Sequence, residues 1–319
     1  MLRHGKDICD LINPVFKIWK YTGLPVLRLE SKNRKLFCQN TPTWCISAPI
    51  ILAISLFFLN QRIMESYTDC ILSLQLGLIT VTNIFAVCLL YKRRKYLALL
   101  ISKFSKMEQT FFELFQIKSA YSQTRIFLLK FIVIKYISAL IALITDYISE
   151  LNYKAYIIWY HISWNYEFIF EIIYLTLFLA LKYYYGRLED YINAKGPSEI
   201  RKILNETVEI ILCLDDIIVT IKKLFQEIIL VKVVTECLCT TAGLYYSILT
   251  VPRLEFSLTT TAFFWLFAQV LADFSIVCFF QAVVEQKESL IDKIDQIYKV
   301  SERRLLPYKQ VCSDILREC

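Results

Sequence analysis

The fold is decided by one stretch of sequence, residues 70–95, which reads CILSLQLGLITVTNIFAVCLLYKRRK. The 22 residues from Cys70 to Tyr91 contain no charged side chain, and four basic residues, 92–95, follow directly. A helix that crosses the ~30 Å hydrocarbon core of a bilayer needs about 20 mostly apolar residues, because each residue advances it by ~1.5 Å. The stretch therefore predicts a membrane span with a basic group at one end.

The composition of the whole chain agrees with this interpretation. Of its 319 residues, 56% are hydrophobic, 15% are aromatic and only 20% are charged, which is too apolar for an ordinary soluble domain. We therefore expect an all-α fold, a polytopic membrane helical bundle with six transmembrane helices. The six apolar stretches that are long enough to span a bilayer are 44–60, 70–91, 126–148, 155–181, 228–251 and 257–284.

Lysine and arginine alternate between the segments that join these stretches. From the N-terminus, successive segments hold 8, 1, 8, 1, 7, 1 and 7 basic residues. The positive-inside rule therefore places the N-terminus, residues 92–125, residues 182–227 and the C-terminal tail in the cytosol. The net charge of +7 follows from these segments, so the expected partner of the basic groups is the lipid bilayer and no nucleic acid is expected.

This topology divides the chain into five regions. Apolar residues recur at helical spacing after the fourth span, before the fifth span and after the sixth span, and Gly196-Pro197 interrupts the pattern. We expect these three cytosolic extensions to pack together, the alternative being separate amphipathic helices on the inner leaflet. The regions are a cytosolic N-terminal segment (1–43), transmembrane helices 1 to 4 with a cytosolic loop at 92–125 (44–181), a cytosolic helical extension (182–227), transmembrane helices 5 and 6 (228–284) and a cytosolic tail (285–319).

The sequence offers little for catalysis. Only two histidines, His4 and His161, occur in the chain, and it has no glycine-rich phosphate loop, zinc-protease motif or nucleophile elbow. We expect neither an enzyme nor a bound cofactor or metal.

Three other classes of membrane protein fit this layout less well. A non-conducting adhesion or scaffold protein would have larger outer domains, which the layout lacks. A G-protein-coupled receptor needs an extracellular N-terminus, which the basic N-terminal segment argues against. A secondary transporter is the strongest alternative, although such proteins commonly have spans broken by glycine or proline. Here only Pro49, Gly77 and Gly243 lie inside the predicted spans.

The layout resembles that of the insect gustatory receptors. The N-terminal stretch INPVFKIWKYTGLPVLRLE (12–30) is similar to the opening of that family, with Pro14 and Gly23-Leu24-Pro25 ahead of the first span. The resemblance extends over the whole chain and implies a subunit of a ligand-gated cation channel that detects a small-molecule tastant. It also implies a homo- or hetero-tetramer with related receptor subunits, in the plasma membrane of sensory neuron dendrites, with a cytoplasmic N-terminus.

One part of the family pattern has no counterpart in these residues. The family's seventh span, which lines the pore and ends in a Thr-Tyr and Gln-Phe signature, would follow the linker in which RRLLPYKQVCSDILREC lies. Truncation, a short isoform and divergence are all open explanations. On this basis, the chain alone is not expected to conduct ions.

The resemblance places a ligand pocket in the outer half of spans 3 to 6. Small molecules bind mostly apolar cavities that carry a few polar groups, and aromatic and polar side chains recur at helical spacing here. Packing between helices is an equally good explanation of each of these residues. The candidates are Asp146, His161, Trp164, Phe168, Tyr245, Tyr246, Thr261, Trp265 and Gln269.

Several charged residues lie inside the predicted spans, where each costs about 2.5–3.5 kcal/mol on insertion scales and so should face a partner. Lys232 is expected near Asp273, with Glu236 one helical turn above it. An ion or proton relay, as in a transporter, is the alternative to structural pairing. The charged residues are Lys130, Lys135, Glu167, Glu171, Lys232, Glu236 and Asp273.

Depth in the membrane predicts two further pairs. The third and fourth spans are antiparallel, and a rise of ~1.5 Å per residue puts Lys130 level with Glu171 and Lys135 level with Glu167. We therefore expect contacts of Lys130 with Glu171 and of Lys135 with Glu167.

Overall fold

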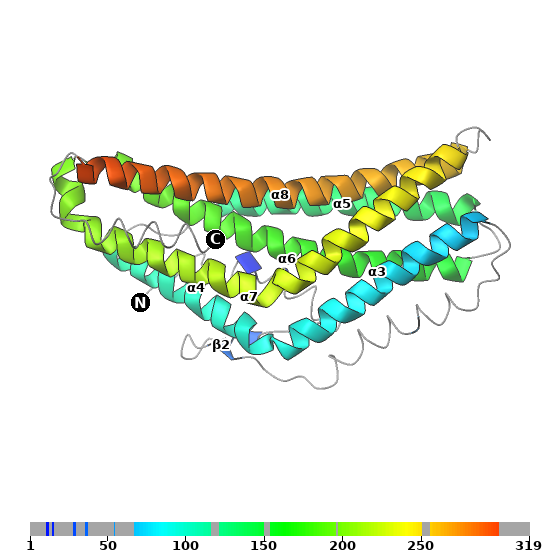
Figure 1. Cartoon of the computed structure of the whole chain (residues 1–319), viewed down its shortest axis with the longest axis horizontal. Coiled ribbons are helices and arrows are strands. Elements are labelled where there is room, and N and C mark those ends of the chain that lie inside the picture. The colour runs from blue at the N-terminus through cyan, green and yellow to red at the C-terminus, as the bar shows by residue number, and fades with distance from the viewer. Residues whose placement is uncertain are drawn as a thin grey trace.

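The computed structural model is an elongated bundle of long helices that lie along one another (Figure 1). It describes residues 67–115, 121–149, 154–195, 197–250 and 256–299, and positions 11, 12, 15, 28, 29, 36, 37 and 54. The first predicted span, 44–60, lies outside the described residues apart from position 54. The helices are α3 (Tyr67–Lys92), α4 (Arg94–Phe115), α5 (Ser122–Ser149), α6 (Lys154–Asn193), α7 (Pro197–Thr250) and α8 (Phe256–Lys299), and the short strands β1 (Arg28–Leu29) and β2 (Leu36–Phe37) pair antiparallel.

The expected all-α membrane bundle is confirmed. The predicted spans 70–91, 126–148, 155–181 and 257–284 lie within α3, α5, α6 and α8, and α7 covers 228–250 of the fifth. Among the described residues, three helical stretches are long and apolar enough to cross a membrane, namely Ser73–Lys92, Gln123–Thr145 and His161–Asn193.

The lengths of the last three helices exceed what a bilayer requires. Helices α6, α7 and α8 contain 40, 54 and 44 residues, whereas about 20 residues span the hydrocarbon core. The break predicted at Gly196-Pro197 is present, because α6 ends at Asn193 and α7 begins at Pro197. Each apolar stretch therefore continues into its extension as one helix.

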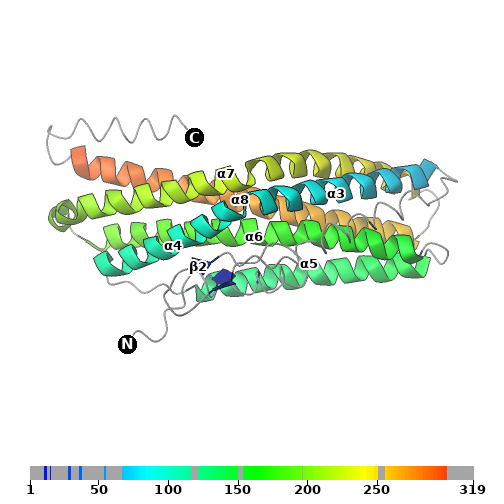
Figure 2. The same ribbon diagram turned by 90° about the horizontal axis from the view of Figure 1, so that it is seen from below.

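Most of segment 92–125, which was expected to be a connecting loop, is a helix, α4. Helix α4 buries one face, including Leu97, Phe104 and Phe111, while Lys95 and Lys106 are exposed. Helices α3 and α4 meet at an angle near Arg93, and α7 lies alongside both of them (Figures 1 and 2). The sequence interpretation did not include this helix, although its buried residues recur at the 3.6-residue period.

The outer face of α5 is apolar and exposed. Leu129, Ile137 and Ile148 have 61%, 53% and 67% of their surface exposed, and α8 shows the same pattern at Phe263 and Phe274. Exposed apolar surface of this extent marks contact with a membrane or a partner. By contrast, α6 lies in the centre of the bundle and buries nearly every residue from His161 to Leu181.

Candidate functional site: a buried charge cluster and its polar surroundings

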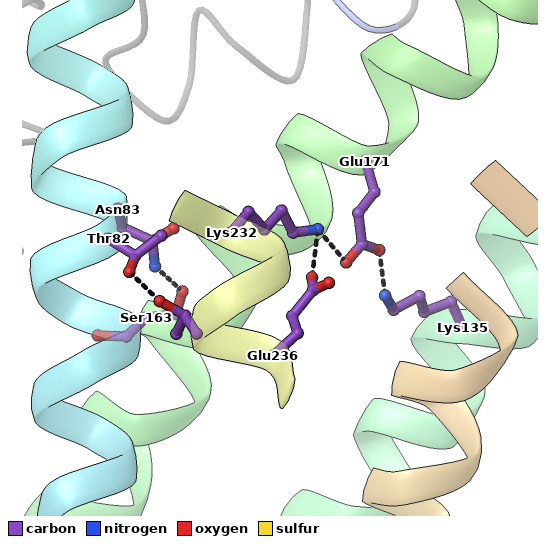
Figure 3. Close-up of polar contacts among 8 residues, drawn as sticks. Thr82, Asn83, Lys135, Ser163, Glu171, Lys232 and Glu236 are labelled. Carbon is purple, nitrogen blue, oxygen red and sulfur yellow. Dashed lines mark hydrogen bonds and ion pairs between the residues drawn. The ribbon is translucent and has the colours of Figure 1, made fainter. Parts of the chain in front are cut away.

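Glu171 of α6 is the centre of a buried group of charges. Its side chain is 1% exposed and contacts the ammonium groups of two lysines, Lys135 of α5 and Lys232 of α7. The Lys232 Nζ atom lies 2.6 Å from Glu171 Oε1 and 2.8 Å from Glu236 Oε1, one turn further along α7 (Figure 3). The arrangement connects three helices through charge-assisted hydrogen bonds, which are stronger than neutral ones.

These contacts correct the pairing that depth alone predicted. Lys135 contacts Glu171 and not Glu167, and the two oxygens of Glu171 are occupied by Lys135 and Lys232. Lys130 was expected at Glu171 but is an exposed residue of α5. The reason is geometric: Lys130 and Lys135 are five residues apart, so they project from α5 about 140° apart and only Lys135 faces α6. The side chain of Asp273, expected near Lys232, lies outside the described residues.

Glu167 lies one turn before Glu171 on the same side of α6. It is 3% exposed, and its Oε1 atom has no hydrogen-bond partner among the described residues. Its electrostatic neighbours are Lys232, Glu236, Glu171 and Lys135. The expected contact with Lys135 is therefore absent, although Glu167 belongs to the same cluster.

Two of the predicted ligand-binding residues surround Lys135. The Lys135 Nζ atom lies 5.7 Å from the ring centre of Trp164 and 4.8 Å from that of Phe168, distances at which a cation is attracted to an aromatic face. Trp164 and Phe168 are 2% and 3% exposed, and His161 packs edge-on to Trp164. The structure thus brings these three residues together, next to the charge cluster.

The remaining ligand-binding candidates are not brought together by the described side chains. Tyr245 of α7 is 46% exposed. The other candidates belong to helices, but their side chains lie outside the described residues; they are Asp146, Tyr246, Thr261, Trp265 and Gln269.

A row of polar side chains on α3 was missed by the sequence interpretation. Gln75 Nε2 donates to the Cys239 carbonyl at 2.8 Å, and Asn83 Nδ2 donates to the Ser163 carbonyl at 2.7 Å. The hydroxyls of Thr82 and Thr235 lie 2.6 Å apart. Polar residues inside an otherwise apolar span commonly form hydrogen bonds to neighbouring helices. The polar residues within 70–91 therefore indicated contacts between this span and its neighbours.

A second buried acid lies outside the predicted spans. Glu108 of α4 accepts hydrogen bonds from the hydroxyls of Tyr121, at 2.6 Å, and Tyr184 of α6, at 2.5 Å. Burial raises the pKa of Tyr121 well above its ordinary value, and the interactions of this phenol with Tyr184 and Glu108 raise it further. The Tyr121 phenol is therefore a protonated donor at neutral pH.

The helical extensions of α6, α7 and α8 pack together, as expected. Lys287 of α8 lies 2.8 Å from Asp215 of α7, which also accepts a hydrogen bond from Tyr185 of α6 at 3.2 Å. Lys293 of α8 lies 2.5 Å from Glu189 of α6. These contacts, with apolar packing of Leu188, Leu214 and Leu290, fasten the three extensions to each other.

Comparison with known proteins gives a likeness in structure but none in sequence. Neither a protein-family model nor a curated protein matches the sequence. The structure is similar to that of the insect olfactory receptor OR5 from Machilis hrabei, with a TM-score of 0.66 and 11% sequence identity over 88% of this chain and 81% of that chain. At this identity the likeness shows a shared fold. The helical architecture implied by the resemblance to insect chemoreceptors is therefore confirmed at the level of the fold.

Proposed function

We propose that the chain is a chemosensory receptor subunit of the insect type that responds to a small-molecule tastant. The observation that carries the proposal is the fold shared with an insect olfactory receptor along most of both chains. The six apolar stretches and the long packed extensions of α6, α7 and α8 support it. The activity proposed is gating of a cation current by the tastant, in a homo- or hetero-tetramer with related receptor subunits.

The proposed tastant site lies between the outer halves of α5, α6, α7 and α8. His161, Trp164 and Phe168 are among the described aromatic residues of α6 in this region, and Tyr245, Trp265 and Gln269 are contributed in sequence by α7 and α8. The described residues around Trp164 are closely packed, with Ile79, Ala139 and Cys239. These neighbours belong to α3, α5 and α7, and we therefore place the tastant on the α8 side of Trp164.

The function is tested by expressing the chain with related receptor subunits in cells and recording calcium entry during exposure to a panel of tastants. A response that requires this chain supports the proposal. In the same assay, Trp265→Ala should abolish or shift the response at unchanged surface expression, whereas Leu129→Ala, on the exposed face of α5, should not. Substrate accumulation by the chain alone in proteoliposomes, with no ligand-dependent current, would instead support a transporter.

The proposed membrane orientation puts the N-terminus and the extensions of α6, α7 and α8 in the cytosol. The proposed location of the protein is the plasma membrane of sensory neuron dendrites. The alternation of basic segments supports this orientation. An epitope tag at the N-terminus or at 192–200 should be detected only after permeabilisation, and a tag at 150–153 without it. The opposite pattern would contradict both the orientation and the receptor type.

A further inference from the structure

The buried cluster around Glu171 contains an unequal number of charged groups. Its described members are three carboxyl groups and two ammonium groups, and all of them are buried. If every group were ionised, the cluster would carry a net charge of −1 in the apolar interior. The members and their exposed fractions are Lys135 1%, Glu167 3%, Glu171 1%, Lys232 5% and Glu236 7%.

The contacts show which carboxyl group is in excess. Glu171 contacts both lysines, and Glu236 contacts Lys232. Glu167 contacts neither lysine, and its Oε1 atom is the one left without a hydrogen-bond or ion-pair partner among the described residues of the cluster. A buried charge without a partner is strongly disfavoured, and such a group is neutralised instead.

We propose that Glu167 is a proton-binding site and that the folded protein holds its carboxyl group in the neutral form. The cluster then contains two ammonium groups, two carboxylates and one carboxylic acid, and has no net charge. The titratable groups that face Glu167 are Lys135 from α5, Glu171 from α6 itself, and Lys232, Glu236 and Cys239 from α7. The side chains described on α3 at this level, Thr82 and Asn83, are uncharged.

A proton fits the geometry better than a metal ion. Among the described residues, no three His, Cys, Asp or Glu side chains converge as metal ligands. The lysines occupy both carboxylate oxygens of Glu171 and one oxygen of Glu236, which a cation would need as ligands. A proton needs only the free oxygen of Glu167 and an apolar surrounding, which the packing of α6 supplies.

The experiment compares two isosteric substitutions one helical turn apart in the purified full-length protein. Glu167→Gln imitates the protonated acid and should leave the thermal denaturation midpoint and the monodisperse fraction at their original values. Glu171→Gln removes the anion shared by two lysines and should lower both values markedly. Glu285→Gln, at an exposed position of α8, is the matched control.

The pH dependence gives a second measurement. The folded chain holds a proton on Glu167, whereas a glutamate in the unfolded chain, with a pKa of about 4.3, has lost its proton at neutral pH. The stability of the folded protein should therefore fall as pH rises. The folding equilibrium constant should decrease by up to about tenfold per pH unit. Glu167→Gln should remove this component, together with one carboxylic-acid C=O band in the infrared spectrum. The proposal is overturned if Glu167→Gln destabilises the protein as much as Glu171→Gln does, or if Glu167→Gln fails to fold. It is also overturned if sodium or potassium stabilises the original protein and this stabilisation is lost in Glu167→Gln.

Discussion

The carboxylate of Glu171 on α6 lies 2.6 Å from the ammonium group of Lys232 on α7, 61 residues further along the chain. Lys135 of α5 contacts the other oxygen of the same carboxylate. One acidic side chain in the central helix therefore binds two neighbouring helices at once. Its removal should be more harmful than the removal of either lysine.

Glu171→Gln should destabilise the folded protein by about 3–5 kcal/mol, because it leaves two buried ammonium groups without their anion. Lys135→Met should cost clearly less, since methionine fills the space beside Trp164 and Phe168 and Glu171 still contacts Lys232. Thermal denaturation of detergent-purified variants, followed by size-exclusion chromatography, measures the order. An equal loss of stability in the two variants would show that Glu171 does not stabilise the fold through contacts with both lysines.

Asn83→Ala should weaken the packing of α3 on α6 by about 1–2 kcal/mol, because it removes the hydrogen bond to the Ser163 carbonyl. Val81→Ala is the matched control two residues away, since Val81 is 57% exposed and contacts little of the protein. The denaturation midpoint should be lower for Asn83→Ala than for Val81→Ala. A lower midpoint for Val81→Ala than for Asn83→Ala would contradict the role of this polar contact.

Tyr121→Phe should destabilise the protein by about 1–3 kcal/mol, because it removes a hydrogen bond to the buried Glu108 carboxylate. Tyr184→Phe should have a similar effect, and the double variant should lose less than the sum, since both hydroxyls donate to the same oxygen. Equilibrium or thermal unfolding of the four proteins gives the coupling. Strict additivity would indicate that the two tyrosines act independently.

The same tyrosine predicts a dependence on alkaline pH. Its pKa is raised in the folded state, so the folded protein retains a proton that the unfolded chain loses near pH ~10. The contribution of Tyr121 is fully present below that pH and is lost as pH rises further. Tyr121→Phe should therefore show a smaller loss of stability than the original protein between neutral pH and strongly alkaline pH.

Asp215→Asn should loosen the packed extensions more than Glu189→Gln does. Asp215 is largely buried and binds both Lys287 and Tyr185, whereas the Lys293–Glu189 pair is 34% and 21% exposed. An exposed pair contributes about 0–1 kcal/mol, and a buried hydrogen bond to a charge about 1.5–3 kcal/mol. Limited proteolysis near the α6–α7 turn should be faster for Asp215→Asn, and the reverse order would contradict the assignment.

The sequence by itself determined the helical architecture, because the signals for it are local. The length of an apolar run sets whether a helix can cross a bilayer, and Gly196-Pro197 ends one helix and starts another without reference to any partner. The need of Lys135, Glu171 and Lys232 for partners also follows from their position inside apolar runs. Helix α4 was equally readable, since its apolar face at Leu97, Phe104 and Phe111 repeats at the helical period.

Only the tertiary structure decided which charges meet. Depth along a helix follows from residue number, but the rotation of one helix about its axis relative to the next depends on how all the side chains between them pack. Glu167 and Glu171 lie one turn of about 5.4 Å apart on the same face of α6, a distance that the long side chain of Lys135 can cover. Residue number therefore placed the lysine near both acids, and packing selected Glu171.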